Sequence, residues 1–549
     1  MHRHTAKMSP SLAAYMSSAL NAIAALRIPL SVQAVAAAGF LIGGAVVSRV
    51  KYLRSIRSVP GPPFHFVLGA RCILAPGARP SFFTQRHLVL RGLHAKYGPV
   101  VKIVLPFGRG AMICYSKPDD VAGAFKDTVS FPTRPSRNSP MPNGMLALRT
   151  GATWHAHRSA LVSALSTKAM RTYLPTVIEH AEDLCDALDG SKGDVEVHKL
   201  LTASTFCVIS KIGFGVELGS IHEVIMSPLM ELGGHLLAGQ VAMITTPVPI
   251  VKILRALPRS WMPESQRQMF AARDVYTTQA RDVYQAHAQS QPAECAPDQV
   301  QSLLEALARA RLPFEEARDE IITLMIAGHE TTANTLSWAL YLLALNPSAQ
   351  RAARDEVASL CAPDQALSLD DLGKLALVRG VFLEALRLYS TVPMVARSCE
   401  RDARVGAYVV PKGSTLVYSI TAAALDNQAF SGADAFDPWR HTTKAVDAAA
   451  WHPFGPTGPR KCMGYRLADI EAVAYLATIL RRFEIEPASA GAPEPVGYTD
   501  ATLGPKESGL YLRFRASTAV REMAPVSSDA PRTAFEWPGA RNAPSAAAA

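Results

Sequence analysis

The sequence predicts a mainly α-helical fold with a smaller β portion. Long stretches carry apolar residues at helical spacing, and between them lie short runs rich in β-branched and aromatic residues that end at glycine or proline. Apolar residues make up 49% of the 549 residues and charged residues only 19%, which suits a chain with a large core. Because no internal repeat is visible, we expect one large folded domain.

The N-terminal end predicts a membrane anchor. Residues 28–47 form an uncharged run of twenty residues, and a helix of that length crosses about 30 Å of hydrocarbon. We assign residues 1–27 to an N-terminal segment and residues 28–48 to a transmembrane helix. A signal peptide is the alternative, but the run is long for one, and basic residues follow it in place of a cleavage site. These residues are Arg49, Lys51, Arg54 and Arg57.

The region after the anchor predicts an orientation and a hinge. By the positive-inside rule the four basic residues place the rest of the chain in the cytosol, although the bases that precede the anchor reduce the asymmetry. Residues 49–63 end in "SVPGPP", whose prolines prevent a continuing helix and make a stiff hinge. A folded domain over 64–517 follows. Residues 518–549 are rich in Ala, Pro and Ser without periodicity and predict a disordered tail.

The folded domain is expected to hold small β elements between long helices. "PVVKIVLPFG" and "GAMICYS" predict a pair of strands, and "RVGAYVVPKGSTLVYS" predicts a hairpin that turns at residues 411–413. Helical periodicity predicts helices at 153–188, 315–345, 371–389 and 465–483.

Charge and cysteine content exclude several classes of protein. The net charge is +10, but the chain has no zinc-finger spacing, basic-region zipper or long Lys/Arg block, so we expect no nucleic-acid partner. A membrane surface or an acidic protein partner remains consistent with the charge. The eight cysteines are scattered without a CxxC pair, which argues against a disulfide framework or a zinc module.

The helix expected at 315–345 is apolar nearly all round and should run through the interior, yet its middle reads "AGHETT". Gly328 costs about 1 kcal/mol relative to alanine, and the hydroxyls of Thr331 and Thr332 can bond to backbone carbonyls. Such a helix can bulge and open a small polar groove. A tolerated polar patch is the simpler interpretation. Because an unpaired buried carboxylate is costly, Glu330 needs a partner or a role, and proton delivery is a candidate.

Two further pairs of residues lie at helical spacing. Glu384 and Arg387 are three residues apart, and their apolar neighbours indicate a partly buried pair tied to a third group, although an exposed pair of this spacing is common by chance. Trp154 and Arg158 lie one turn apart and can hold an anionic group of a ligand. A plain stack of the two side chains is equally consistent.

Cys462 lies in "WHPFGPTGPRKCMGYR", a rigid loop of glycine, proline and basic residues just before a predicted helix. Arg460 and Lys461 raise the local positive potential, and the amides of a helix N-terminus also favour an anion, so we expect a thiolate here. A free buried cysteine is the usual alternative, and it does not account for the basic loop. If Cys462 binds a metal, we expect it to be the metal's single protein ligand.

Together these segments resemble the haem-thiolate monooxygenases of the cytochrome P-450 superfamily, from the proline hinge to about residue 515. The resemblance implies the cytochrome P-450 fold, preceded by one transmembrane helix. "AGHETT" is similar to the family's oxygen-activating segment and implies catalytic roles for Thr331 and Glu330. "EALR" and "FDPWRH" imply a structural triad of Glu384, Arg387 and Arg440.

The resemblance also implies a haem site. "GPRKCMG" is similar to the family's cysteine loop and implies that Cys462 is the axial ligand of the iron. "WHAHR" and "PMVAR" resemble segments that contact the haem. The residues implied to bind the cofactor are Cys462, Trp154, Arg158, Arg397, Arg460 and Phe454. The family usually has its phenylalanine seven residues before the cysteine, whereas Phe454 is eight before it, so the loop contains one extra residue.

The activity that the resemblance implies is monooxygenation, the insertion of one oxygen atom from O2 into a lipophilic small molecule by hydroxylation or epoxidation, in secondary metabolism or xenobiotic oxidation. The implied cofactor is haem b, with electrons supplied indirectly by NADPH through a separate NADPH-cytochrome P-450 reductase. Cytochrome b5 is a further candidate partner. The anchor and the hinge resemble the microsomal branch, and the motif style resembles fungal members. We therefore expect a single-pass protein of the endoplasmic reticulum with a cytosolic catalytic domain.

Two other functions are weighed against this one. An oxygen-independent haem-thiolate isomerase or dehydratase would not require "AGHETT", and a non-catalytic haem-binding carrier or sensor would not turn over with a reductase. "PSRNSPMPNGMLAL" and "STVPMVA" are expected to line an apolar substrate pocket. Terpenoids, fatty acids and polycyclic aromatic compounds all fit such a pocket.

Overall fold

The structure is a computed structural model of the chain. It describes residues 30–66, 69–70, 82, 84–106, 110–134, 139–191, 193–245, 258–289, 302–360, 365–443, 450–499, 502–505 and 509–517. The side chains of residues 30–42 and 240–245 are not among those described. The expected N-terminal segment and C-terminal tail lie outside the described residues.

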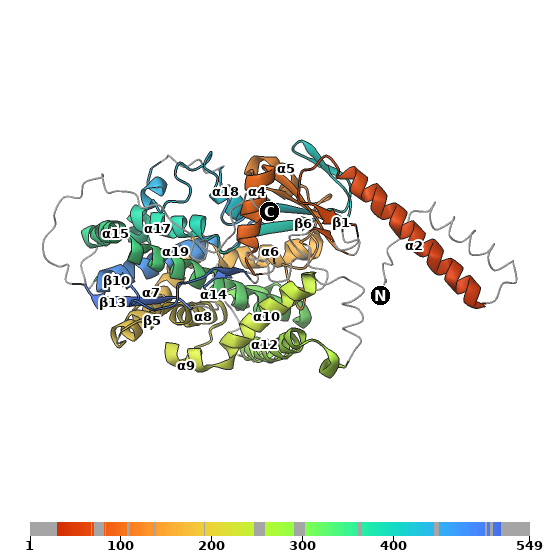
Figure 1. Ribbon diagram of the computed structural model, residues 1–549. Helices are drawn as coiled ribbons and strands as arrows, with labels where there is room; N and C mark the ends of the chain where they lie inside the picture. Colours follow the sequence, from red (N-terminus) through yellow and green to blue (C-terminus); the bar gives the residue numbers. More distant parts are fainter. Residues whose placement is uncertain are drawn as a thin grey trace. The chain divides into compact units, whose positions relative to one another are not determined.

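The chain divides into two compact units, Met1–Ser58 and Val59–Ala549. The described part of the first unit is mainly the helix α2, Leu30–Ser55, which overlaps the expected anchor at residues 28–48 (Figure 1). Most side chains of that expected anchor lie outside the described residues. Among the residues that the structure describes, no helix has the length and apolar character needed to cross a membrane.

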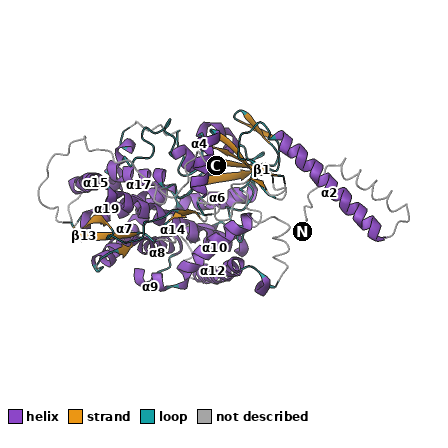
Figure 2. Cartoon of the chain, viewed as in Figure 1, coloured by secondary structure: helices purple, strands orange, loops and turns teal. Residues whose placement is uncertain are grey.

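The second unit is mainly helical, as Figure 2 shows. Its described α-helices are α4 (Arg86–Tyr97), α5 (Pro118–Lys126), α6 (Ala152–Ala164), α7 (Thr167–Asp189), α8 (Val197–Phe214), α9 (Ile221–Met226), α10 (Pro228–Thr245), α12 (Glu264–Gln289), α13 (Leu303–Arg309), α14 (Phe314–Leu345), α15 (Pro347–Leu360), α16 (Leu369–Lys374), α17 (Ala376–Leu388), α18 (Ile420–Ala424) and α19 (Tyr465–Arg482). Two short 3-10 helices are η1 (Arg259–Trp261) and η2 (Pro438–His441).

The long helix α14 forms the centre of this unit. It packs against α8, α17 and α19, and most of its side chains are buried, which is what its apolar sequence predicts. Asn346 ends the helix, and Pro347 starts α15 because proline fits the first turn of a helix but not its interior.

The strands form small separate sheets. The described strands are β1 (Phe64–His65), β2 (Gly69–Ala70), β3 (Val100–Val104), β4 (Ala111–Tyr115), β5 (Val195–Glu196), β6 (Met394–Ser398), β7 (Ala403–Val405), β8 (Tyr408–Val410), β9 (Thr415–Ser419), β10 (Phe483–Pro487), β11 (Tyr498–Thr499), β12 (Leu503–Gly504) and β13 (Tyr511–Ala516). The largest described sheet has the order β3-β4-β9-β6, and a second has the order β10-β13-β5. The pairs β1-β2, β7-β8 and β11-β12 are two-stranded.

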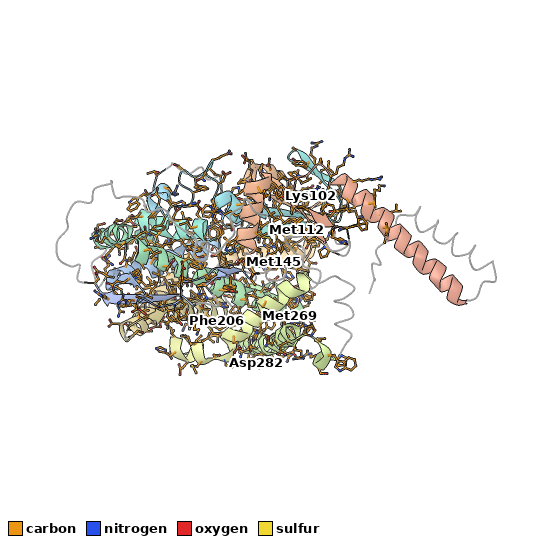
Figure 3. All side chains as sticks on the ribbon, in the orientation of Figure 1. Lys102, Met112, Met145, Phe206, Met269 and Asp282 are labelled. Carbon is orange, nitrogen blue, oxygen red and sulfur yellow. The ribbon has the colours of Figure 1, made fainter. Side chains whose placement is uncertain are left out.

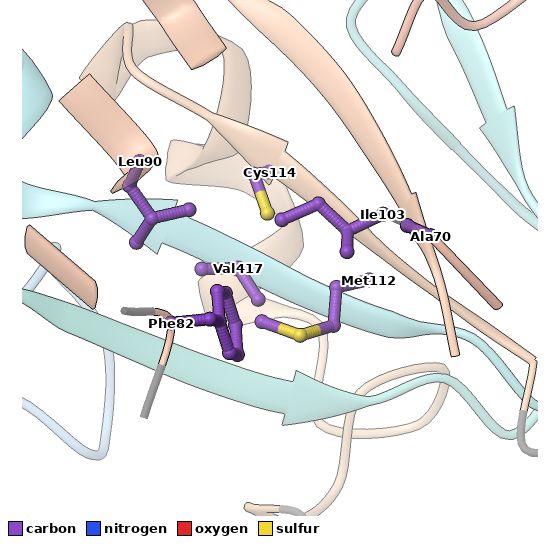
Figure 4. Close-up of a cluster of buried hydrophobic side chains, with 7 residues drawn as sticks. All are labelled: Ala70, Phe82, Leu90, Ile103, Met112, Cys114 and Val417. Carbon is purple, nitrogen blue, oxygen red and sulfur yellow. The ribbon is translucent and has the colours of Figure 1, made fainter. Parts of the chain in front are cut away.

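A hydrophobic cluster lies on one face of the four-stranded sheet (Figure 4). It joins side chains from strands and helices that are far apart in the sequence. Its buried members are Ala70, Phe82, Leu90, Ile103, Met112, Cys114 and Val417. Met112 also marks the sheet in Figure 3, where all described side chains are drawn. This cluster ties α4 to the sheet that carries β6.

The prediction of a mainly α-helical fold with a smaller β portion is confirmed. The strand pair expected near residue 100 is β3 and β4, which pair antiparallel. The helix expected at 153–188 is divided at Leu165 and Ser166, where the Ser166 hydroxyl caps α7 by accepting from the Ala169 N–H. The helix expected at 371–389 is likewise divided into α16 and α17.

The prediction of a hairpin that turns at residues 411–413 is wrong. The observed hairpin pairs β7 with β8 and turns at Gly406, whose φ of 54° is in the left-handed region. The strand β9 instead lies between β4 and β6. Four of its five residues are buried, so burial in the larger sheet decides its partners over the local turn signal of proline, lysine and glycine.

Candidate active site

Cys462 lies in a closed loop just before α19. Its backbone N–H donates to the Phe454 carbonyl at 3.0 Å, which joins the two ends of the loop. Gly455 has a φ of 86°, a conformation that favours glycine, and a Cβ at Gly458 would lie 2.6 Å from the Phe125 carbonyl oxygen. The loop therefore needs glycine at both positions. The Cys462 side chain is accessible.

The surroundings of Cys462 act on its thiol in opposite directions. Burial among protein atoms raises the pKa of the thiol, even though its side chain is accessible. The backbone of Gly464 and three cations lower the pKa, but burial outweighs them. The cations are Arg134, Arg158 and Lys461. We predicted a thiolate from the basic loop alone. The cations do act in the expected direction, although burial outweighs them, and a metal cation bound to the sulfur would favour the thiolate.

Arginine side chains from three elements gather at this loop. Arg158 on α6 donates to the Lys461 carbonyl at 2.9 Å. Arg460, in the loop itself, donates to the Thr150 hydroxyl at 2.7 Å and to nearby backbone carbonyls. Arg397 on β6 is 4% exposed and lies over the Phe125 ring at 4.6 Å. In the described part of the chain, no carboxylate forms an ion pair with any of these three arginines.

The close approach of these cations is unfavourable. Burial and the neighbouring charges of Arg134 and Arg460 lower the pKa of Arg397 to about 8. Burial and the charges of Arg134 and Arg158 lower the pKa of Arg460 to about 9. A group with negative charge bound at this place would relieve the repulsion. The cluster is therefore suited to bind an anion.

Trp154 supports the cluster and offers it no hydrogen-bond donor. Its indole N–H donates to the Met145 carbonyl at 3.2 Å (Met145 is labelled in Figure 3). The guanidinium groups of Arg460 and Arg158 lie 4.8 Å and 5.5 Å from the indole ring centre. We gave two interpretations of Trp154 and Arg158, and these distances match the one in which the two side chains stack. The indole ring then positions the guanidinium groups of Arg158 and Arg460.

The "AGHETT" segment lies in the middle of α14. Glu330 is buried, and its Oε1 accepts from the Thr502 hydroxyl at 2.7 Å. Thr331 is half-buried, and its hydroxyl donates to the Ala327 carbonyl at 3.1 Å. The helix is α-helical throughout, so the expected bulge is not observed. A Cβ at Gly328 would lie 2.5 Å from Ile209, so this glycine allows close packing of α14 on α8.

Glu384 is the centre of a buried ionic network. Arg387 donates to both of its carboxylate oxygens, at 2.7 and 2.8 Å, and both side chains are fully buried. Arg440 donates to Oε1 at 3.0 Å, and the His441 ring lies at hydrogen-bonding distance, 2.8 Å, from Oε2. Burial would raise the pKa of Glu384, but the hydrogen bonds from Arg387 and His441 outweigh it and bring the pKa to about 2. The carboxylate therefore stays ionised near neutral pH, and its stabilising contribution is lost progressively as the pH falls from the ordinary pKa of a glutamate to about 2.

A scan against family models matches residues 60–512 to "Cytochrome P-450". The chain belongs to this family.

Individual cytochromes P-450 match parts of the chain or most of it. The human "25-hydroxyvitamin D-1 alpha hydroxylase, mitochondrial" is 36% identical over 191 residues, which is 34% of this chain and 37% of that protein. Cytochrome P-450 734A1 of Arabidopsis thaliana is 25% identical over 458 residues, 78% of this chain and 85% of that protein. The crystal structure of the cytochrome P-450DA haem domain has a TM-score of 0.70, 25% identity, and coverage of 84% of this chain and 98% of that domain.

The residues of this cytochrome P-450 fit the haem b that the family binds. Cys462 supplies one accessible sulfur ahead of a helix N-terminus, as a single thiolate ligand requires. The two carboxylates of a haem would offset the charge of Arg158, Arg397 and Arg460. Within the described residues, Arg397 donates one hydrogen bond, to the Ala396 carbonyl, so most of its N–H groups are open to such a ligand.

Several residues of this cytochrome P-450 site escaped the sequence interpretation. The charge of Arg134 contributes to lowering the pKa of Arg397 and of Arg460, and it opposes the effect of burial on the pKa of Cys462. No sequence motif marks this residue. His441 directly follows Arg440 in "FDPWRH", and its position beside a triad member was an available signal. Thr502 lies 172 residues from Glu330 along the chain, so no local pattern joins the two.

Proposed function

We propose that this protein is a monooxygenase that inserts one atom of O2 into a lipophilic small molecule. The observation that carries the proposal is the acid and alcohol pair on α14, Glu330 and Thr331, in a chain of the cytochrome P-450 family. When bound, the haem supplies the activation of dioxygen and the transfer of one oxygen atom. The chain's own residues hold the cofactor, keep water out and deliver protons.

In this proposal the residues around the loop bind the cofactor. Cys462 would supply the thiolate ligand of the iron, and Arg158, Arg397 and Arg460 would hold the two carboxylates. Trp154 positions two of these arginines through its ring, and Phe454 fixes the loop through its carbonyl. Burial, and after it the charges of neighbouring arginines, lowers the pKa values of Arg397 and Arg460, and an anionic ligand would oppose both effects.

Proton delivery falls to Thr331 and Glu330. The Thr331 hydroxyl donates its proton in a hydrogen bond to the Ala327 carbonyl. Its oxygen can therefore accept a hydrogen bond from a water or from a protonated oxygen of the substrate. Glu330 directly precedes Thr331 on α14, and its carboxylate can take up a proton and release it. The pair thus supplies an acceptor at a fixed position and, one residue earlier on the helix, a group that can carry a proton.

A surface cleft of about 440 Å³ lies away from Thr331 and Cys462, in that none of its lining residues belongs to α14 or to the Cys462 loop. It is lined by Ser139, Pro140, Pro142, Arg259, Met262, Phe270 and Arg273. Three of these residues belong to the "PSRNSPMPNGMLAL" stretch that we expected to line the pocket. Its lining combines apolar residues with two arginines, and the proposal of a lipophilic substrate therefore rests on the apolar character of the sequence stretches and on the family, not on this cleft.

The first test is turnover with Thr331→Ala. Wild-type protein with NADPH, NADPH-cytochrome P-450 reductase and a panel of lipophilic compounds under ¹⁸O₂ should form products that carry one ¹⁸O atom. In Thr331→Ala we expect haem content and the carbonyl spectrum to be retained, because only a hydroxyl and a methyl group are lost. Product per NADPH should fall and hydrogen peroxide should rise, since protons are delivered by the wrong route.

Thr331→Ser is the matched control, because it keeps the hydroxyl, and it should restore most of the product yield. Products without ¹⁸O would contradict the monooxygenase function and favour the oxygen-independent isomerase or dehydratase. No turnover of any compound despite normal haem reduction would favour a carrier or sensor. Unchanged coupling in Thr331→Ala would assign "AGHETT" a packing role.

We also propose that residues 28–48 anchor the protein in the endoplasmic reticulum membrane, with the catalytic domain in the cytosol. The uncharged run and the basic residues after it support this orientation. The reductase would dock on the basic surface around Lys461, which is exposed.

Deletion of residues 1–50 tests the anchor. We expect the truncated protein to leave the membrane fraction in large part and to keep its haem, because the anchor precedes the family match at residue 60. Fractionation and the carbonyl spectrum measure the two outcomes. Deletion of residues 1–27 alone is the matched control and should leave the protein in the membrane. If the protein expressed without any deletion is secreted and is cleaved near residue 48, the segment is a signal peptide.

A further inference from the structure

A short hairpin, β11 with β12, packs on α14 close to Glu330. Thr502 lies directly before β12 and is buried, and its hydroxyl donates to Glu330 Oε1 at 2.7 Å. The side-chain amide of Asn334, one turn further along α14, donates to the same hydroxyl at 3.2 Å. Thr502 thus bridges two residues on one face of α14.

The two hydrogen bonds give the Thr502 hydroxyl a fixed direction. An amide NH2 group can only donate, so the Thr502 oxygen accepts from Asn334, and its single proton is directed at Glu330. A hydrogen bond donated to a carboxylate stabilises the ionised form relative to the neutral acid. It also restricts the carboxylate to one rotamer. Thr502 therefore influences both the charge and the position of Glu330.

Further contacts fix the hairpin itself. The Leu503 N–H donates to the Thr391 carbonyl at 2.8 Å, and the Thr391 hydroxyl lies 2.7 Å from that of Thr335 on α14. A Cβ at Gly504 would overlap the side chain of Asn334, so glycine allows the hairpin to approach α14 this closely. The place of Thr502 is set by two separate parts of the chain.

We propose that Thr502 is a positioning residue for proton transfer through Glu330. It accepts a hydrogen bond from Asn334 and donates one to Glu330 Oε1, which holds the carboxylate in one orientation, and it neither gains nor loses a proton itself. This inference rests on the proposed function, in which Glu330 is the proton source. It assigns a role in oxygen chemistry to a hairpin that is distant in sequence from "AGHETT".

The test compares Thr502→Val, Thr502→Ser and Thr478→Val in the full-length haem-loaded protein. Valine has nearly the shape of threonine but lacks the hydroxyl. Thr478 is the matched control because its hydroxyl is also buried and has no hydrogen-bond partner among the described residues. The first readout is the infrared band of the Glu330 carboxylate, isolated by subtracting the spectrum of Glu330→Gln. The second is the rate of NADPH oxidation with the reductase in H2O and in D2O.

We expect Thr502→Val to shift the carboxylate band, to slow NADPH oxidation roughly tenfold and to increase the solvent isotope effect, because a hydrogen bond to a charged group is lost. Thr502→Ser should restore all three, and Thr478→Val should change none. An unshifted band in folded Thr502→Val would overturn the positioning role. A shifted band with unchanged NADPH oxidation and isotope effect would overturn the link to proton transfer. If the wild-type protein oxidises no NADPH, the proposed monooxygenase function is wrong. The shift of the infrared band in Thr502→Val still decides whether Thr502 positions the Glu330 carboxylate.

Discussion

Replacing Cys462 by alanine is expected to abolish the strongly red-shifted Soret band of the reduced carbonyl complex, because that band requires a thiolate ligand. The accessible sulfur just ahead of α19 would be lost, while the loop would keep its closing hydrogen bond to the Phe454 carbonyl, which uses the backbone N–H. We therefore expect a folded chain with weakly bound or wrongly ligated haem. Absorbance spectroscopy with carbon monoxide and haem quantification measure the result.

Cys185→Ala is the matched control for this experiment. Cys185 is fully buried on α7, and burial raises the pKa of its thiol, so it is a poor metal ligand. The control should keep the full red-shifted band. If Cys462→Ala also keeps it, another cysteine binds the iron, and the function we propose for the loop is wrong.

The second large effect is expected from Glu384→Ala and Arg387→Ala. Either change leaves a fully buried charge without its main partner, at a cost of about 3–5 kcal/mol, a large part of a typical folding free energy. Arg387→Ala would also remove a hydrogen bond from three backbone carbonyls, those of Ala424, Ala433 and Ala435. We expect haem-free or aggregated protein, measured by haem content, circular dichroism and size-exclusion chromatography.

Lys374→Ala is the matched control for the buried pair. Lys374 pairs with Asp371 at the same spacing of three residues, but its side chain is 60% exposed. Loss of an exposed pair should change the free energy of unfolding by less than about 1 kcal/mol. Soluble and haem-loaded Glu384→Ala protein with slower turnover would contradict a structural role and assign the network to catalysis.

Contacts within one helix were the part of the site that the sequence could predict. Glu384 and Arg387 are visible as a pair because helical geometry brings residues three apart to one face. The same rule indicates Trp154 and Arg158, although it cannot decide between a donor and a stack. Arg134 and Thr502 were missed because their partners are fixed only by tertiary folding. The prediction of a bulge at "AGHETT" was wrong. It considered the hydrogen bonds that the threonine hydroxyls can make to the backbone, and it left out the close packing of α14 on α8 that Gly328 allows.

The fold shows the same division between local and long-range information. Long apolar periodicity predicted α14 and α19 to within a few residues, and a short alternating run predicted β3 and β4. The prediction that β9 pairs with the strand just before it was wrong, because its neighbour β4 lies about 300 residues earlier in the chain. Local turn residues cannot report such a pairing, which depends on burying β9 between two other strands.

The closed loop between Phe454 and Cys462 has a consequence for how such loops are found in sequences. The hydrogen bond between its ends joins the two residues that the family's pattern names. The arc between them is constrained, because Gly455 has a positive φ, Gly458 packs against the Phe125 carbonyl and Arg460 is buried. The additional residue is therefore accommodated while the ends of the loop stay joined. A search pattern with a rigid count between phenylalanine and cysteine would discard sequences whose ligand geometry is intact.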